Sequence, residues 1–314
     1  MKFSSTAAKT AAVTMSLALL LGTTACNRGG DAASDSQDVT LAVSTLNNPF
    51  FVELRDGAQQ AADAAGVQLD VVDAQNDSAT QTNQIATAAT SGTDGVIINP
   101  VDSDAAAASV APLVSNSTPI VAVDRAVNGA EVQSLVSSDN VAGGKQAADE
   151  LAKAMGGKGT VIVLQGVAGT SASRDRGAGF ADGLKAYPDI KIVAQQTANF
   201  DRAEALNVAT NLLQANPGVT GLFAENDEMA LGAIQALGAK AGADVKVVGF
   251  DGTADGLAAI EAGTMTATIA QQPAELGKRS VEVLVQLLND ETVEKSIPVP
   301  VTTVTSENVA DFAG

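Results

Sequence analysis

The feature that most constrains this chain is a regular alternation of strand-like and helix-like stretches, which begins near residue 39 and continues to about residue 270. The strand-like runs are short, apolar and rich in valine and isoleucine, which is typical of strands buried on both faces of a sheet. Longer stretches with helical periodicity lie between them. A repeated strand–helix order predicts an α/β fold with doubly wound parallel sheets and right-handed crossovers.

The alternation falls into two consecutive sets. The strands predicted for the first set span residues 39–45, 67–72, 95–99 and 119–123, followed by a short run at 135–138. Those predicted for the second set span residues 160–165, 190–196, 219–224 and 245–250. The helices expected between them include 78–91, with Ser78 as its cap, 102–116 and 140–155. Because 314 residues are more than one core usually supports, the two sets predict two similar α/β domains.

The C-terminal tail departs from this alternation. It is predicted to form a strand over 265–270, a helix over 275–288 and an extended segment over 297–305. A tail that passes back and forth between two domains makes several crossovers. We therefore expect a hinge where these crossovers lie side by side.

The N-terminal segment belongs to neither domain. Two lysines precede the apolar residues 11–25, a stretch too short to cross a bilayer but suited to the core of a signal peptide. Cys26, the single cysteine, follows and resembles the lipobox of bacterial lipoproteins, although Thr23 stands where a large aliphatic residue is usual. We expect a lipidated Cys26 and a flexible tether over 27–38. The alternative is ordinary cleavage after Ala25, which would leave a secreted or periplasmic soluble protein with a free thiol.

Charge and composition exclude several classes of function. The net charge of −18 argues against nucleic-acid binding and against attraction to anionic lipid, which both require clustered lysine and arginine. The chain has no histidine and one cysteine, which excludes Ser-His and Cys-His nucleophile pairs, His-ligated zinc and an internal disulfide. We expect a monomer with no catalytic residue, no metal and no cofactor, although composition alone leaves room for a Ser-Lys or carboxylate-only enzyme.

Polar and aromatic side chains gather where the predicted strands end, the edge at which open α/β sheets bind ligands. They are Asn48, Phe50, Phe51, Asn99, Asp124 and Arg125 in the first set, and Arg176, Phe200, Asn226, Asp251 and Gln271 in the second. Amides, carboxylates and guanidinium groups can hydrogen-bond hydroxyls, and phenylalanine rings can cover the C–H faces of a sugar. The balance of two acids with two bases suits a neutral polyol better than a phosphate or a carboxylate.

Each of these residues also has a purely structural interpretation. Phe50 and Phe51 could be core residues at the start of a helix. Asn226 and Asp201 could be helix caps and nothing more. Arg176 could form a surface ion pair. The set as a whole, more than any one residue, favours a binding crevice.

Seven motifs make the interpretation more specific. They are Leu46-Asn-Asn-Pro-Phe-Phe51, Asn99-Pro-Val-Asp-Ser-Asp104, Asp124-Arg125, Gln165-Gly-Val-Ala-Gly-Thr-Ser171, Glu225-Asn-Asp-Glu-Met-Ala-Leu-Gly232, Gly249-Phe-Asp-Gly252 and Ala267-Thr-Ile-Ala-Gln271. In this order they resemble the bacterial ribose-binding proteins, solute-binding proteins of the type I periplasmic binding protein family. The resemblance covers the chain from about residue 39 to the C-terminal region. It implies two Rossmann-like lobes joined by a three-segment hinge near residues 138–139, 271–272 and 300.

The resemblance also implies a ligand set and a division into lobes. It adds Ala172 to the strand-end residues named above, and it implies that phenylalanines sandwich a pyranose ring while polar groups bind its hydroxyls. It divides the chain into a signal peptide over 1–26, a tether over 27–38, an N-terminal lobe over 39–138 and 272–300, and a C-terminal lobe over 139–271 and 301–314. The departures from the family lie outside the cleft, at Arg174-Asp175 and in the loop Tyr187-Pro-Asp189.

The function that the resemblance implies is that of a lipid-anchored receptor on the outer face of the cell membrane. It would bind D-ribose and deliver it to the permease of an ABC importer, and thus act on the ATPase only indirectly. It would touch the membrane only through its anchor and bind no nucleic acid.

Three alternatives are open. The first is a receptor for another monosaccharide, such as allose, galactose or another pentose. The second is a sugar-responsive regulator, which would need a DNA-binding module where this chain has a signal core. The third is an enzyme on the same fold, although the sequence has no histidine, metal cluster or phosphate loop.

Overall fold

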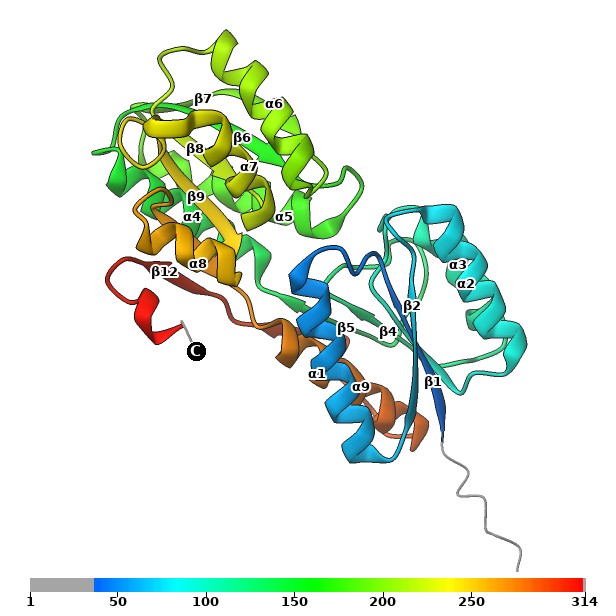
Figure 1. Ribbon diagram of the computed structural model, residues 1–314. Coiled ribbons are helices and arrows are strands. Elements are labelled where there is room, and N and C mark those ends of the chain that lie inside the picture. Colours follow the sequence, from blue (N-terminus) through cyan, green and yellow to red (C-terminus); the bar gives the residue numbers. More distant parts are fainter. Residues whose placement is uncertain (1–36, 313–314) are drawn as a thin grey trace, which may run out of the picture. The chain divides into compact units, whose positions relative to one another are not determined.

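A computed structural model describes residues 37–312 of the chain. These residues form two α/β lobes, each built on a six-stranded sheet (Figure 1). The predicted signal peptide, Cys26 and the tether up to residue 36 lie outside the described residues. Within the described part of the chain, no helix has the length and apolar character needed to cross a membrane.

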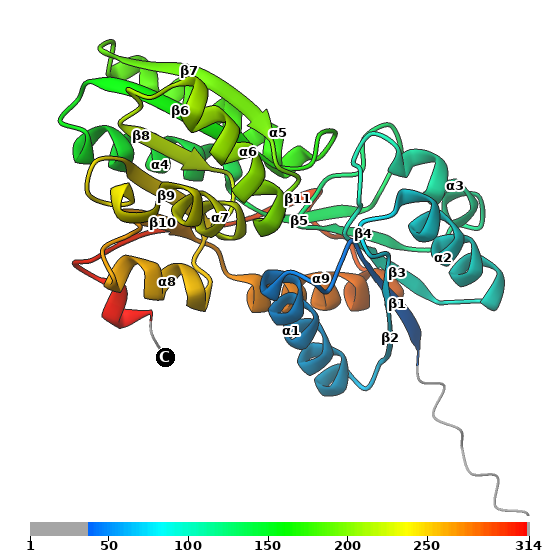
Figure 2. The same ribbon diagram turned by 45° about the horizontal axis from the view of Figure 1, so that its top comes forward.

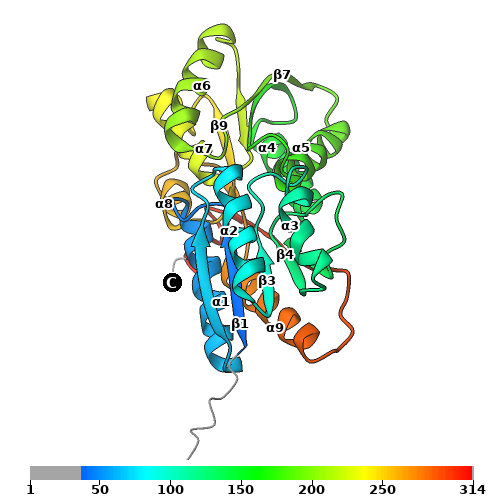
Figure 3. The same ribbon diagram turned by 90° about the vertical axis from the view of Figure 1, so that its right-hand side faces the viewer.

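The first lobe has a sheet in the order β11-β5-β4-β3-β1-β2, in which every pair is parallel. Its strands are β1 (Asp38–Val43), β2 (Gln68–Asp73), β3 (Gly95–Ile98), β4 (Ile120–Val123), β5 (Ser134–Ser138) and β11 (Ser296–Val299). Its helices are α1 (Pro49–Ala65), α2 (Ser78–Ser91), α3 (Ala106–Ser115) and α9 (Pro273–Leu288). Helix α1 packs on α9 and α2 packs on α3, as Figures 2 and 3 show.

The two faces of this sheet have separate cores because side chains alternate along each strand. On β1, Leu41 and Val43 join the core under α1 and α9, whereas Ala42 joins the core under α2 and α3. Helices α1 and α9 approach closely through glycines: a methyl group at Gly57 would overlap the backbone of Ala274. This close packing fixes the helix whose first turn carries two of the predicted ligand residues.

The second lobe has a sheet in the order β12-β10-β9-β8-β6-β7, in which β12 is antiparallel to β10 and the other pairs are parallel. Its strands are β6 (Gly159–Gln165), β7 (Ile190–Thr197), β8 (Gly221–Ala224), β9 (Lys246–Asp251), β10 (Ala267–Ala270) and β12 (Thr302–Thr305). Its helices are α4 (Asn140–Ala154), α5 (Ser171–Gly183), α6 (Arg202–Ala215), α7 (Asp227–Leu237) and α8 (Ala254–Glu261), with short 3-10 turns at Leu184–Ala186, Gly238–Lys240 and Val309–Asp311.

The chain passes between the two sheets at three places: between β5 and α4, between β10 and α9, and between β11 and β12. These segments adjoin one another. The backbone N–H of Asp139 donates to the carbonyl of Val299 at 3.0 Å, and Gln272 Nε2 donates to the carbonyl of Pro300 at 2.9 Å. The three connecting segments therefore lie side by side in a narrow bundle.

The predicted α/β fold with doubly wound, mainly parallel sheets is confirmed, with local differences. The cap of α2 is Asp77 and not Ser78, because the backbone N–H of Thr80 donates to the Asp77 carboxylate. The segment predicted as one extended run over 297–305 is divided into two strands, which pair in different sheets. Pro300 lies between them and lacks the N–H that a continuous ladder needs.

Candidate ligand-binding site

A small pocket lies at the carboxyl ends of the strands and is lined by residues of both lobes. Its lining residues are Asn48, Phe50, Phe51, Asp124, Arg125, Ala172, Arg176, Phe200, Asn226, Asp251 and Gln271. The pocket therefore brings together eleven of the twelve residues predicted as ligand contacts. The twelfth, Asn99, lies behind the pocket wall.

The turn after β1 places two aromatic rings in the wall. Asn48 caps α1, since its Oδ1 accepts from the backbone N–H of Phe50 at 2.9 Å, and Pro49 occupies the first helical position. The rings of Phe50 and Phe51 meet edge to face, with centroids 5.0 Å apart. Both residues also belong to the core of the first lobe, so they are core residues at the start of a helix and line the pocket as well.

Asp124 stands at the end of β4 in a strained backbone conformation. Its φ of 64° is in the left-handed region, which costs a non-glycine residue about 1–3 kcal/mol and is concentrated at functional sites. The buried side chain of Asn99 donates from Nδ2 to Asp124 Oδ2 at 3.1 Å, and its Oδ1 accepts from the backbone N–H of Ser44. Asn99 thus holds the carboxylate in position from behind the pocket.

Arg125 connects the aromatic residues of the two lobes. Its guanidinium carbon lies 5.3 Å from the ring centroid of Phe51 and 5.5 Å from that of Phe200. Its Nη1 donates to the carbonyl of Pro100 at 3.1 Å, and its Nε lies 3.6 Å from Asp124 Oδ2. A cation between two ring faces is favourable when it is desolvated, as this 3% exposed side chain is.

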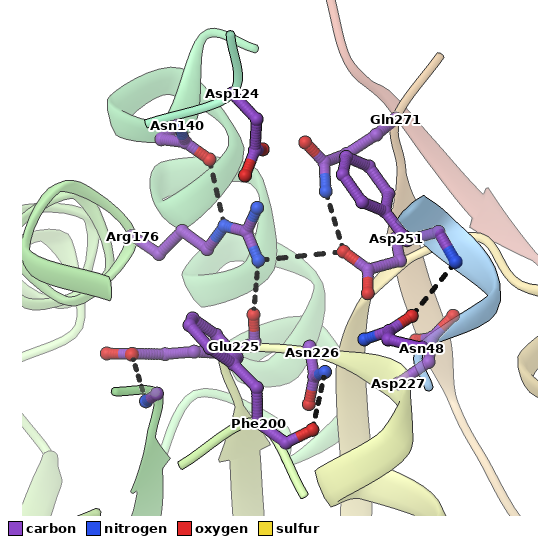
Figure 4. A network of polar contacts seen from close by, with 12 residues as sticks. Asn48, Asp124, Asn140, Arg176, Phe200, Glu225, Asn226, Asp227, Asp251 and Gln271 are labelled. Atoms are coloured by element: carbon purple, nitrogen blue, oxygen red, sulfur yellow. Dashed lines mark hydrogen bonds and ion pairs between the residues drawn. The ribbon is translucent and has the colours of Figure 1, made fainter. Parts of the chain in front are cut away.

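Arg176 reaches the pocket from α5 and is held on several sides (Figure 4). Its Nε donates to Asn140 Oδ1 at 2.8 Å, and its Nη1 donates to the carbonyl of Glu225 at 2.7 Å. The same Nη1 lies 3.5 Å from Asp251 Oδ1, and the guanidinium stacks 4.0 Å from the ring centroid of Phe250. The side chain is buried, so the alternative of a surface ion pair is wrong.

Phe200 and Asn226 come from neighbouring loops of the second lobe. Phe200 has a φ of 59°, and its ring lies where Gly166 leaves room, because a methyl group there would overlap the ring. Asn226 caps α7 through its Oδ1, as the structural interpretation proposed, and its Nδ2 donates to the carbonyl of Phe200 at 3.3 Å (Figure 4). Asp201 caps α6 and does not line this pocket.

Asp251 and Gln271 close the remaining side of the pocket. Gln271 Nε2 donates to Asp251 Oδ1 at 2.6 Å. Asp251 has a φ of 124°, a conformation that favours glycine, so the surrounding contacts must hold it in place. The next residue, Gly252, is anchored through its backbone N–H, which donates to Asp227 at 2.9 Å.

Two fully buried acids below the pocket were missed by sequence reasoning. Asp227 also accepts from the backbone N–H of Thr253 at 2.8 Å and from the hydroxyl of Thr268 at 2.7 Å. Glu225 accepts from the backbone N–H of Gly166 at 2.7 Å and from the hydroxyl of Ser173. The available signal was the pair of acids that flanks Asn226 directly after a buried strand. Acids that are buried at such a position must be hydrogen-bonded.

Burial dominates the electrostatics of the pocket. It raises the pKa of Asp124, against the opposing effect of Arg125 and Arg176. It raises the pKa of Asp251 well above the ordinary value, again against Arg176. It raises the pKa of Glu225 to about 7 and lowers the pKa of Arg125. The charged groups of the pocket wall nevertheless balance as two acids and two bases.

Three pocket residues carry buried polar atoms for which the described residues offer no hydrogen-bond partner: Asp124 Oδ1, Arg125 Nε and Gln271 Oε1. An unsatisfied buried polar group costs about 1–3 kcal/mol, so a ligand that satisfies these atoms is favoured. Two are acceptors and one is a donor, and hydroxyl groups can serve both. Residues 37–312 contain no cluster of acidic or cysteine side chains able to hold a metal ion. The arrangement suits a small, neutral, hydroxyl-rich molecule with one apolar face.

Comparison with known proteins gives consistent matches over nearly the whole described chain. A family profile described as a periplasmic binding protein domain matches residues 39–292. The ribose import binding protein of Escherichia coli (strain K12) is 45% identical over 284 residues, covering 90% of this chain and 96% of that protein. The ribose import binding protein of Bacillus subtilis (strain 168) is 43% identical over 262 residues, covering 83% and 85%.

Solved structures agree with the sequence matches. The Caulobacter myo-inositol binding protein, bound to myo-inositol, has a TM-score of 0.83 and 35% identity, covering 88% of this chain and 95% of its own. The predicted resemblance and the type I fold are therefore confirmed. The chain belongs to the periplasmic binding protein family.

Proposed function

We propose that this protein is the extracytoplasmic substrate-binding component of an ABC sugar importer and that its ligand is D-ribose. The observation that carries the proposal is one small pocket whose wall combines three aromatic rings, two carboxylates and two guanidinium groups from both lobes. Two relatives at 43% and 45% identity are named as ribose import binding proteins, which supports the same ligand. We propose no catalytic role for any residue.

The pocket wall offers a suitable partner for each part of a pyranose. The rings of Phe51 and Phe200 belong to different lobes and can cover opposite C–H faces of the sugar. The unpaired atoms of Asp124, Arg125 and Gln271 can accept from or donate to its hydroxyls. All twelve residues of the predicted ligand set keep this role as a proposal, with Asn99 acting through Asp124.

Affinity and selectivity follow from the same groups. A hydrogen bond to a charged group contributes about 1.5–3 kcal/mol, so these bonds together supply a large part of the roughly 8 kcal/mol of micromolar binding. An epimer with one hydroxyl reversed would leave a buried donor or acceptor unpaired. Selectivity among sugars should therefore be strong, because water does not replace the missing hydrogen bond of a buried group.

Delivery to a permease would depend on lobe movement. A sugar that bonds to both lobes favours the arrangement in which they approach, because those contacts form only there. We propose the hinge at residues 138–139, 271–272 and 300, where the chain passes between the sheets. The approached lobes would then present a surface that the permease recognises.

Calorimetry with D-ribose tests the proposal. Asp124→Ala and Arg176→Ala should each abolish measurable binding, because each leaves its buried partners of opposite charge uncompensated. Arg279→Ala and Asp182→Ala are matched controls, since these residues form solvent-exposed ion pairs away from the pocket, and both variants should bind ribose normally. Near-normal affinity in either pocket variant would refute the site.

The membrane anchor is a separate proposal. We propose that Cys26 carries a lipid that retains the protein at the outer face of the cell membrane, with a secreted or periplasmic soluble protein as the alternative. Cys26→Ala should release the protein into the surrounding medium or compartment. Unchanged membrane retention of this variant, measured by fractionation, would count against lipidation.

A receptor for a different polyol is the second candidate function. It is favoured by the likeness to a protein solved with myo-inositol, a ring that also carries hydroxyls around an apolar face. Titration with ribose, allose, galactose and myo-inositol distinguishes the candidates. The ribose assignment requires ribose to bind at least about tenfold more tightly than the others, which corresponds to about 1.4 kcal/mol.

A further inference from the structure

The two lobes also contact each other directly, beside the pocket, through two serines. Ser103 lies in the loop after β3 of the first lobe, and Ser171 begins α5 of the second. The backbone N–H of Ser171 donates to Ser103 Oγ at 3.1 Å, and the backbone N–H of Ser103 donates to the carbonyl of Gly169 at 3.2 Å. The backbone N–H of Ala126 donates to Ser171 Oγ at 2.8 Å. Three hydrogen bonds therefore cross from lobe to lobe.

Local structure prepares both loops for this contact. The carboxylate of Asp102 accepts from the backbone N–H groups of Asp104 and Ala105, which orders the loop that presents Ser103. Across the contact, Gly169 has a φ of 89°, and a methyl group there would meet the Asp102 carboxylate at 2.7 Å. The loops can therefore approach because glycine occupies this position.

The contact is buried and lies outside the pocket wall. Ser103 is 0% exposed and Ser171 is 6% exposed, and neither lines the pocket. Their neighbours in sequence, however, are pocket residues: Ala126 follows Arg125, and Ser171 precedes Ala172. Hydrogen bonds that join the lobes outside the pocket, next to the residues that would hold the sugar, stabilise the approached lobes in addition to any contact made by the sugar itself.

We propose that the Ser103–Ser171 contact is a latch that sets ligand affinity from outside the pocket, by slowing the separation of the lobes. The inference rests on the proposed function, because it requires lobes that open to release a sugar. The latch acts mainly on the dissociation rate, since its hydrogen bonds form after the ligand has entered. The pocket residues set which sugar binds, and the latch sets how long it stays.

Stopped-flow kinetics with D-ribose tests the latch. Ser103→Ala and Ser171→Ala should each raise the dissociation rate about fivefold, as expected for loss of one buried neutral hydrogen bond. The double variant should raise it further than either single variant, because the two serines accept different hydrogen bonds, although their direct contact means that the two effects need not multiply. Association rate, melting temperature and the ranking of sugars should not change. Ser115→Ala, which removes an exposed serine that bonds within its own helix, is the control.

Dissociation rates equal to those of the unaltered protein in both single variants would overturn the latch. A loss of melting temperature that accounts for the weaker binding would overturn it as well, because the serines would then be only structural.

A sugar-free measurement separates failure of the latch from failure of the proposed function. Spin labels on Thr87→Cys in α2 and Val193→Cys in β7, in a Cys26→Ser background, report the distribution of distances between the lobes. Without sugar, the latch predicts a population with approached lobes that the double serine variant loses. If ribose does not bind but this population is lost, the ligand assignment fails and the latch stands. Identical distributions with and without the serines overturn the latch whatever the sugar does.

Discussion

The two lobes support the same kind of pocket wall with different chemistry. In the first lobe the support is an amide: Asn99 holds Asp124, and Gln81 in turn donates to the carbonyl of Asn99 and accepts from the backbone of Val101. In the second lobe the support is carboxylate: Asp227 holds the turn after Asp251.

This difference has an electrostatic consequence. A buried amide carries no charge at any pH, whereas a buried carboxylate is costly when ionised and shifts its pKa. Burial raises the pKa of Glu225 and of Asp227, the two acids below the second half of the pocket. Two lobes with similar topology can therefore differ in pH response although the pocket wall itself is balanced in charge.

The largest effect is expected for Asp227→Ala. At least three buried donors would lose their acceptor, at about 1–3 kcal/mol each, so the free energy of unfolding should fall by about 4 kcal/mol. Denaturant unfolding measures this loss. Asp182→Ala removes an exposed acid as control and should change stability little. If the two variants lost similar stability, the carboxylate support of the second lobe would be disproved.

A pH-dependent effect is expected at Glu225. Its folded-state pKa is raised from 4.5 to about 7, so the folded protein binds a proton that the unfolded chain releases. Stability from this group is complete below about pH 4.5 and is lost as the pH rises through about 7, in total about 3 kcal/mol. Glu225→Gln should remove this part of the pH dependence in unfolding measured from about pH 5 to about pH 8. An unchanged pH profile in the variant would contradict the assignment.

The smallest effect is expected for Asn99→Ala, the counterpart in the first lobe. The backbone N–H of Ser44 would lose its acceptor and Asp124 would lose a donor, which should cost about 2 kcal/mol of stability. The amide itself does not titrate, so its loss acts on the pH dependence only through Asp124, whose pKa its hydrogen bond lowers. Ribose affinity should also fall about tenfold as Asp124 loosens. Unchanged stability and unchanged ribose affinity in this variant would contradict the supporting role of Asn99.

Much of the fold could be predicted because local sequence patterns specify it. The strands of both sheets were predicted within a few residues, since buried parallel strands are continuous apolar runs. The strand pattern predicted the last extended segment as one run, and only the family resemblance placed a hinge at residue 300. That segment, from Ser296 to Thr305, is rich in valine and threonine but contains two prolines, and its assignment to two sheets depends on which neighbours it meets.

The sequence by itself determined the α/β class and most of the pocket wall, because the carboxyl ends of parallel strands meet at one edge and carry their following residues there. Only the tertiary structure decided what supports that wall. The place of Asn99 behind Asp124, the burial of Glu225 and Asp227, and the lobe-to-lobe contact of Ser103 with Ser171 each depend on segments far apart in the chain. Desolvation and hydrogen bonding at such positions are set by the packing of distant residues, and no local pattern records them.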